Sequence, residues 1–268
     1  MIKLNNGVEI PQVGLGVFRA AAGEETRRAV RWALEIGYRH VDTARVYGNE
    51  QDVGEAIRES GVPREEVFVT TKLWNSDHGK DKAARACEES LKRLGFDYVD
   101  LYLIHWPQEG LRRESWKALT KLLESGKCRA IGVSNYTIRH LEEVLSTSDV
   151  VPAVDQVELS PFLHQKKLLD FCEKKKIVVE AYSPLVKGKR MQHPTVVKVA
   201  QKVGKTPAQV LIRWSMQHGC VVIPKSVKKE RIDENFGVFD FALDVDDMRL
   251  LDESDENLLT SWDPTYVP

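Results

Sequence analysis

The stretch Val99-Asp100-Leu101-Tyr102-Leu103-Ile104-His105 decides the fold class of this chain. Residues 99–104 form an almost unbroken apolar run, and a histidine follows directly. Such a run is typical of a parallel strand that is buried on both faces. A polar group just past a parallel strand marks the edge of the sheet where α/β proteins build their sites. We therefore expect a strand here, in a parallel sheet covered by helices.

The same pattern recurs along the chain, because short apolar runs alternate with longer segments of helical period. Strands are expected at 13–15, 39–41, 67–70, 99–104, 128–133, 154–157, 177–181 and 221–223. Helices are expected at 24–36, 51–60, 80–94, 114–125, 137–145, 166–175, 195–203 and 207–218. Eight βα units favour an α/β fold, a single (β/α)8 TIM barrel. A doubly wound open sheet is the alternative, but no G-x-G-x-x-G motif opens the first helix.

The composition is that of an ordinary globular protein. The 268 residues are 42% hydrophobic and 29% charged, which argues against disorder. Lys and Arg total 39 and Asp and Glu total 40, so there is no basic field to hold a nucleic acid. No apolar run is long enough for a membrane span, and the first residues lack the apolar region of a secretory signal. We expect one domain over 1–268 that is soluble and cytoplasmic and binds neither nucleic acid nor membrane.

Three features lie outside the repeats. Asn5-Asn6-Gly7 between two short β-prone runs predicts an N-terminal β-hairpin. The chain has four scattered cysteines without a CxxC pair: Cys87, Cys128, Cys172 and Cys220. We expect free thiols in a reducing compartment and no metal site. His164 and His193 fall in loops, where we expect them to be solvated.

Polar side chains follow seven of the expected strands. They are Asp42, Lys72, His105, Ser134-Asn135, Gln156, Tyr182-Ser183 and Lys225-Ser226. In a parallel barrel these ends lie on one face, where active sites of this architecture are built. A single polar residue there can simply mark where a strand leaves the core. Asp42, Lys72 and His105 together are harder to explain in that way, since isolated charges cost free energy unless they are paired.

Tyr47 follows Asp42 closely enough to face the same barrel mouth as Lys72 and His105. A phenol is a poor acid at neutral pH, and we expect the Lys72 ammonium, held by Asp42, to lower the pKa of Tyr47. Tyr47 would then donate a proton, while His105 binds the substrate oxygen. There is no G-x-S-x-G motif and no P-loop, so acyl and phosphoryl transfer are disfavoured.

Four motifs resemble those of the aldo-keto reductase family. They are Asp42-Thr43-Ala44 with Tyr47-Gly48-Asn49-Glu50, Leu101-Tyr102-Leu103-Ile104-His105-Trp106-Pro107, Gly132-Val133-Ser134-Asn135-Tyr136, and Ile223-Pro224-Lys225-Ser226-Val227 continuing to Arg231 and Asn235. They occur in order over essentially the whole chain. The resemblance implies a monomeric carbonyl reductase that uses NADPH/NADP+ and no metal. The implied substrates are small carbonyl compounds: aldoses, methylglyoxal, aromatic aldehydes, and lipid carbonyls or endoperoxides.

The resemblance also implies a role for individual residues. Tyr47 would be the general acid, Lys72 and Asp42 the pair that tunes it, and His105 the group that orients the carbonyl. The implied cofactor-binding residues are Gly16, Val17, Phe18, Asp42, Ser134, Asn135, Gln156, Tyr182, Ser183, Leu185, Lys187, Lys225, Ser226, Val227, Arg231, Glu234 and Asn235. The implied substrate-binding residues are Phe18, Tyr47, Trp74, His105 and Trp106.

The segment that covers the cofactor pyrophosphate departs from the family. Ser183-Pro184-Leu185-Val186 has Val where the family has Gly, and Lys187 and Lys189 are candidates to compensate. Two other functions stay open. One is a regulatory subunit that binds NADPH without turnover. The other is a phosphate-handling barrel isomerase or lyase, in which Lys225-Ser226 could mimic a phosphate cradle.

The C-terminal segment 258–268 is unusually apolar and aromatic for a chain end, so we expect it to be held down. Either Trp262 or Tyr266 folds over the barrel mouth as a wall of the substrate pocket, or the segment docks on the outer helices. The loop after Pro107 and the extension after the last helix are both shorter than in family members with deep, selective pockets, so the resemblance implies a shallow, permissive pocket.

Overall fold

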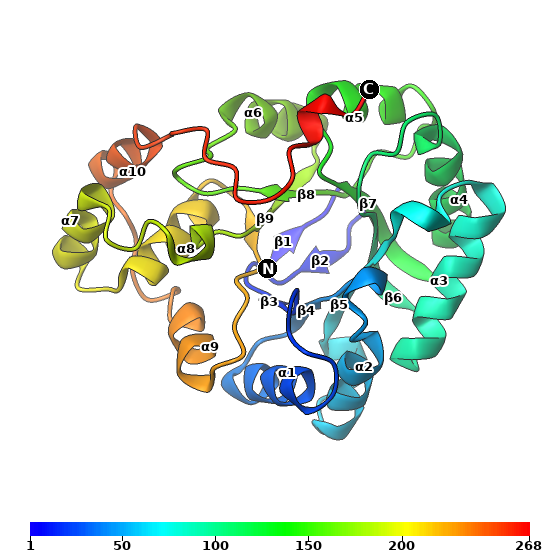
Figure 1. Ribbon diagram of the computed structural model, residues 1–268, viewed down its shortest axis with the longest axis horizontal. Helices are drawn as coiled ribbons and strands as arrows, with labels where there is room; N and C mark the ends of the chain where they lie inside the picture. Colours follow the sequence, from blue (N-terminus) through cyan, green and yellow to red (C-terminus); the bar gives the residue numbers. More distant parts are fainter.

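The computed structural model describes residues 1–268, and eight parallel strands wind through it in chain order (Figure 1). The strands are β3 (Leu15–Gly16), β4 (His40–Asp42), β5 (Phe68–Leu73), β6 (Val99–Ile104), β7 (Cys128–Ser134), β8 (Val154–Glu158), β9 (Val178–Tyr182) and β10 (Val221–Val222). Two parallel bridges join the first and last strands, from Val13 to Val222 and from Gly16 to Lys225. The sheet therefore closes into the barrel that the sequence predicts.

Helices surround the barrel on its outer side (Figure 1). They are α1 (Glu24–Ile36), α2 (Glu50–Glu59), α3 (Lys80–Leu94), α4 (Arg112–Glu124), α5 (Ile138–Leu145), α6 (Lys166–Lys175), α7 (Pro194–Val203), α8 (Pro207–Gln217), α9 (Lys229–Phe236) and α10 (Val245–Asp252). Short 3-10 helices lie at Arg45–Tyr47, Arg64–Glu66, Asn75–Asp77, Val186–Gly188 and Pro264–Tyr266. In α1 the buried residues Ala29, Val30 and Ala33 recur at helical spacing, so one stripe of the helix covers the sheet.

An N-terminal hairpin crosses the centre of the barrel in Figure 1. Its strands β1 (Ile2–Lys3) and β2 (Glu9–Ile10) are antiparallel. Leu4 and Ile10 pack in an inner cluster with Phe68 of β5 and other residues that point into the barrel. The predicted hairpin is thus confirmed, and it closes one end of the barrel and leaves the other end for a site.

The observed strands run one to three residues past several predicted ends. β5 continues to Leu73, so Lys72 lies within the strand, and β4 includes Asp42. β5 is longer than predicted because its backbone pairing with β6 continues to this point, where Lys72 is paired with Leu103. Helices α9 and α10 were not predicted. Each has only eight residues, which is shorter than the window over which a helical period can be recognised, and α9 has only two apolar positions, Ile232 and Phe236.

The C-terminal segment leaves α10, crosses the barrel face and ends beside α5 (Figure 1). The Glu256 and Leu258 N–H groups donate to the carbonyl oxygen of Phe162, and the ring of His140 on α5 donates to that of Val267. The four cysteines are free and buried. No helix has both the length and the apolar character to cross a membrane.

Candidate active site

All the polar groups named at the strand ends except Lys72 and Ser226 line one cavity of about 690 Å³, a usual size for a small-molecule site. The predicted site residues that line it are Gly16, Phe18, Asp42, Tyr47, Trp74, His105, Trp106, Ser134, Asn135, Gln156, Tyr182, Ser183, Leu185, Lys187 and Lys225. The lining residues that the sequence did not single out include Arg19, Val46, Thr260 and Ser261. The convergence of the strand-end groups is therefore seen in the structure.

The alternation of side chains along β5 places Lys72 inside the barrel. Phe68, Thr70 and Lys72 are two residues apart and share one face of the strand, and Phe68 lies in the inner hydrophobic cluster. Asp42 is the last residue of the adjacent strand β4, in register with Thr70. The two side chains therefore meet just above the apolar interior of the barrel.

Lys72 is fully buried and all of its donors are used. Its Nζ lies 2.7 and 2.8 Å from the two carboxylate oxygens of Asp42 and 2.9 Å from the carbonyl oxygen of Thr43. The Tyr47 hydroxyl is 3.4 Å from the same nitrogen. A buried ammonium is stable only with such partners, so Asp42 and Thr43 hold Lys72 against Tyr47.

The predicted lowering of the Tyr47 pKa is wrong for this structure. Burial raises the pKa of Tyr47 well above its ordinary value, and the carboxylates of Asp42 and Glu180 raise it further. The Asp42 carboxylate offsets part of the charge of the Lys72 ammonium, so the cation does not reverse this rise in the pKa of Tyr47. Tyr47 is therefore a neutral phenol at neutral pH.

His105 faces Tyr47 across the cavity. Its ring meets that of Tyr47 edge-on, with 5.7 Å between centroids, and that of Trp74 edge-on at 5.2 Å. Burial, together with the Lys72 ammonium, lowers the pKa of His105 well below its ordinary value. A neutral imidazole carries one N–H group, and His105 Nδ1 has no partner within the chain. The ring can donate one hydrogen bond to a bound substrate.

A buried network that the sequence analysis missed lies behind Asp42. The amide nitrogen of Gln156 donates to Asp42 Oδ2 at 2.8 Å and to Glu180 Oε2 at 2.7 Å. Burial raises the pKa of Glu180 to about 8, with a contribution from the Asp42 charge. Burial lowers the pKa of His40, whose Nε2 is 3.5 Å from Glu180, to about 3. The only sequence signal for Glu180 is a carboxyl group inside a predicted strand.

Four of the implied cofactor-binding residues, at or near the ends of β7, β8 and β9, contact one another. The Ser134 hydroxyl donates to the backbone oxygen of Gln156 at 2.8 Å. The Asn135 amide nitrogen donates to the backbone oxygen of His105 at 2.9 Å, and its side-chain oxygen accepts from the Tyr182 hydroxyl at 2.8 Å. The amide N–H groups of Gln156 and Asn135 are both used within the chain. What remains toward the cavity is a set of acceptor oxygens.

Aromatic rings line the mouth of the cavity, as predicted for Phe18, Trp74 and Trp106. Trp262 joins them from the C-terminal segment, while Tyr266 is 85% exposed and is not part of the wall. The prediction that Trp262 or Tyr266 forms a wall of the cavity is therefore confirmed, and Trp262 is the residue that does so. The end of the segment docks on α5, so each of the two expected arrangements describes part of it.

The segment after β9 has an unusual backbone. Ser183, Val186 and Lys187 have φ values of 50°, 50° and 51°, a left-handed conformation that glycine adopts without strain. This explains why a glycine suits the position of Val186. The Lys187 ammonium donates to the carbonyl oxygen of Thr260 and so joins this segment to the C-terminal segment. Such strain is often found at ligand sites.

Several implied cofactor residues do not line the cavity. They are Val17, Ser226, Val227, Arg231, Glu234 and Asn235. The side chain of Val17 is buried in the core. Ser226 accepts a hydrogen bond from the backbone of Lys228, just before α9. Arg231 is exposed, Glu234 is half-buried and Asn235 is buried, all on α9. The cavity therefore ends at Lys225.

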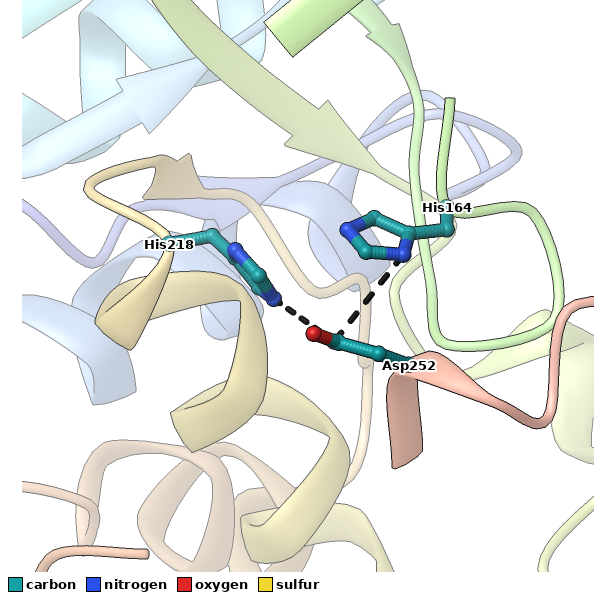
Figure 2. A group of neighbouring side chains, drawn as sticks. All are labelled: His164, His218 and Asp252. Atoms are coloured by element: carbon teal, nitrogen blue, oxygen red, sulfur yellow. Dashed lines mark hydrogen bonds and ion pairs between the residues drawn. The ribbon is translucent and has the colours of Figure 1, made fainter. Parts of the chain in front are cut away.

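The expectation that His164 is solvated is wrong. It is 7% exposed and lies beside His218 (Figure 2). Its ring is edge-on to that of Trp214, with 5.1 Å between centroids. His193 is half-buried and packs edge-on against Phe162. Burial lowers the pKa of His164. Sequence alone could not indicate these contacts, because they depend on where α8 and the loop after β8 meet.

Known proteins resemble this chain over nearly its whole length. The model of the aldo/keto reductase family matches residues 12–256. A 9,11-endoperoxide prostaglandin H2 reductase of Trypanosoma cruzi is 52% identical over 98% of this chain and 94% of its own length. A glyoxal reductase of Bacillus subtilis is 49% identical over 94% of this chain and 91% of its own length. The crystal structure of an aldo-keto reductase of Bombyx mori in complex with NADP is 39% identical, covering 96% of this chain and 93% of its own, with a TM-score of 0.91. The chain therefore belongs to the aldo/keto reductase family of oxidoreductases.

Proposed function

We propose that this protein reduces aldehydes and ketones to alcohols with NADPH. The observation that carries the proposal is the buried chain from Asp42 through Lys72 to Tyr47 at the wall of the cavity. The Lys72 ammonium is 2.7 Å from Asp42 and 3.4 Å from the Tyr47 hydroxyl. A bound reduced nicotinamide supplies a hydride to the carbonyl carbon. The side chains must then supply a proton to the carbonyl oxygen.

Tyr47 is the proposed proton donor. Its raised pKa keeps the phenol protonated at neutral pH, which is the form that reduction needs. As the carbonyl oxygen gains negative charge, the Tyr47 hydroxyl gives up its proton, and the nearby Lys72 ammonium stabilises the phenolate that forms. Asp42 keeps Lys72 in place for this step. The neutral ring of His105 donates a hydrogen bond to the same oxygen and orients the substrate.

The residues present fit a nicotinamide. The side-chain oxygens of Ser134, Asn135 and Gln156 can accept from the two N–H donors of a carboxamide, since the Asn135 oxygen has a second lone pair beside the one that accepts from Tyr182. The half-buried ring of Tyr182 offers a face for stacking. Their mutual hydrogen bonds hold these groups in place before a ligand binds. Acceptors and an aromatic face at one point of the cavity support this end of the cofactor site.

The other end of the proposed site is cationic. Lys225 lines the cavity, and Arg231 lies further along on α9. Neither takes part in an ion pair of the chain, whereas the neighbouring Lys229 pairs with Glu35 at 3.4 Å. We assign the 2′-phosphate of NADPH to Lys225, Ser226 and Arg231, since a phosphate forms strong charge-assisted bonds with such groups. The remaining proposed contacts are Gly16, Val17, Phe18, Ser183, Leu185, Lys187, Val227, Glu234 and Asn235.

The aromatic mouth favours substrates with a flat or apolar body. Phe18, Trp74, Trp106 and Trp262 line it, and such rings bind many shapes through apolar contact and stacking. The names of the two relatives, a glyoxal reductase and a prostaglandin H2 reductase, span small and large substrates. We therefore propose broad specificity that includes methylglyoxal, aldoses, aromatic aldehydes and lipid carbonyls or endoperoxides.

One assay tests the proposal. Purified protein is mixed with NADPH and a panel of carbonyl compounds, and oxidation of the cofactor is followed by its absorbance at about 340 nm. A carbonyl-dependent loss of absorbance supports the proposal. Tight NADPH binding without turnover of any panel member would instead indicate a regulatory subunit. Turnover of a sugar phosphate without an absorbance change would indicate an isomerase or lyase.

We further propose that the chain works as a single monomeric domain in the cytoplasm. Its four buried cysteines are all free, which suits a reducing compartment. Size-exclusion chromatography with light scattering tests the monomer.

A further inference from the structure

Three potential metal ligands converge away from the catalytic cavity (Figure 2). His164 lies in the loop after β8, His218 follows the last residue of α8, and Asp252 is the last residue of α10. One potential ligand atom on each lies within 4.8 Å of those on the other two. Three parts of the chain that are distant in sequence thus bring two imidazoles and a carboxylate together.

The spacing of these atoms is close to what a metal ion requires. Asp252 Oδ1 is 2.9 Å from His218 Nε2 and 3.9 Å from His164 Nδ1. Three ligands of a tetrahedral zinc ion, each bonded at about 2.0–2.1 Å, are about 3.3 Å apart. Small rotations of the two imidazole rings would bring the three atoms to that separation.

Trp214 holds the cluster in place. Its indole N–H donates to Asp252 Oδ1 at 2.7 Å. Its ring also packs edge-on against both histidines, with centroid distances of 5.1 Å to His164 and 4.5 Å to His218. In metal sites the ligating groups are commonly oriented by hydrogen bonds from outside the coordination shell. Trp214 would supply that support to the carboxylate.

The ring of His164 distinguishes this cluster from an ordinary hydrogen-bonded network. Its side chain is only 8% exposed, and neither ring nitrogen makes a hydrogen bond, although Nδ1 faces the Asp252 carboxylate. His218 and Asp252 are 22% and 33% exposed, so an ion can reach the cluster from solvent. Water could complete the coordination, as it does in zinc sites with three protein ligands.

We propose that His164, His218 and Asp252 bind one divalent transition-metal ion such as Zn2+. Imidazole ligands suit zinc, nickel, copper and cobalt, whereas Mg2+ and Ca2+ are bound by oxygen ligands. The ion joins α8, α10 and the loop after β8. Because the C-terminal segment starts directly after Asp252, the ion stabilises the folded chain at the base of that segment. The site is independent of the proposed carbonyl reduction.

The test uses the full chain without an affinity tag, titrated with Zn2+ by calorimetry and with Co2+ by visible absorbance. We expect one ion per chain, a Co2+ spectrum of low coordination number, and a higher Tm with Zn2+. His164→Gln removes no hydrogen bond of the side chain, and we expect it to weaken Zn2+ binding by at least about tenfold. Asp252→Asn keeps an acceptor for Trp214 and should weaken binding similarly.

His193→Gln is the matched control, since this half-buried histidine packs on Phe162 outside the cluster. It should bind Zn2+ like the unaltered chain. The proposal is overturned if the unaltered chain binds no Zn2+, or if His164→Gln, folded by circular dichroism, binds it as tightly as His193→Gln does. The assay reads metal binding directly, so it does not depend on the proposed enzyme activity.

Discussion

The rings of Trp106 and Trp262 lie 4.8 Å apart, which places the C-terminal segment directly beside the proposed reacting groups. Trp106 follows His105 in sequence, so this wall adjoins the histidine that is proposed to orient the carbonyl. The Glu158 carboxylate holds the segment there, because it accepts from the Thr260 and Ser261 N–H groups at 2.9 Å each. The wall of the proposed substrate pocket therefore includes a segment that lies outside the family motifs.

Replacing Trp262 should change substrate preference. In Trp262→Ala we expect KM for bulky aromatic aldehydes to rise by up to roughly tenfold, since an aromatic pair contributes about 0.5–1.5 kcal/mol beyond its buried area. KM for methylglyoxal and the affinity for NADPH should stay nearly constant. Steady-state kinetics with both substrates check this. Tyr266→Ala, at an 85% exposed ring, is the control, and equal effects of the two variants would contradict the assignment.

Removing the Tyr47 hydroxyl should abolish the proton transfer. In Tyr47→Phe we expect kcat to fall by more than about 10²-fold, the lower range for loss of a general acid, with NADPH affinity nearly unchanged. Tyr102→Phe is a matched control, because its hydroxyl is buried without a partner and lies outside the cavity. Substantial activity in Tyr47→Phe would exclude this residue as the proton donor.

The barrel could be predicted from sequence because its strands are buried on both faces and read as apolar runs. The positions of Asp42, Lys72 and His105 also followed, since parallel strands place their carboxyl ends on one face. Contacts between side chains from distant parts of the chain could not be predicted from the apolar runs. Burial raises the pKa of Tyr47 most, followed by Asp42 and Glu180. Glu180 lies on β9, which β10 and β3 separate from β4, so nothing in the sequence near Tyr47 indicates this contact.

The surroundings of His164 show the same limit. Its burial depends on Trp214 and His218 of another helix region, which the loop sequence around it does not reveal. The docking of the C-terminal segment was predicted only as two alternatives. Its path depends on Glu158, whose carboxylate lies at the end of a strand and has no partner near it in sequence.

Arg231 should select NADPH over NADH. In Arg231→Ala we expect the Kd for NADPH to rise by at least about tenfold, because a charge-assisted hydrogen bond contributes about 1.5–3 kcal/mol. The Kd for NADH should hardly change. Fluorescence titrations of both cofactors check this. Lys229→Ala serves as the control, since Lys229 is on the same helix but pairs with Glu35. A similar loss of affinity for both cofactors in Arg231→Ala would refute the assignment.

Glu180 should make the stability of the protein depend on pH. Burial raises its pKa from the ordinary 4.5 to about 8 in the folded chain. Between these values the unfolded chain loses the proton of Glu180 while the folded chain keeps it. The folded state then binds more protons, so this group lowers the free energy of unfolding as the pH rises from about 4.5 to 8. Below and above that window its contribution is constant.

Glu180→Gln removes this titration and keeps an acceptor for the Gln156 amide. We therefore expect the variant to gain stability relative to the unaltered chain as the pH rises from about 4.5 to 8, because only the unaltered chain pays to keep a buried proton. The free energy of unfolding of both proteins is measured with denaturant at pH 5, 6, 7 and 8. In the difference between the two proteins, the contributions of all other titrating groups cancel. The exposed Glu65→Gln is the control and should show a flat difference. If the difference for Glu180→Gln does not change with pH, the carboxyl group ionises in the folded chain as it does in the unfolded chain. Glu180 would then not be protonated in the network behind Asp42.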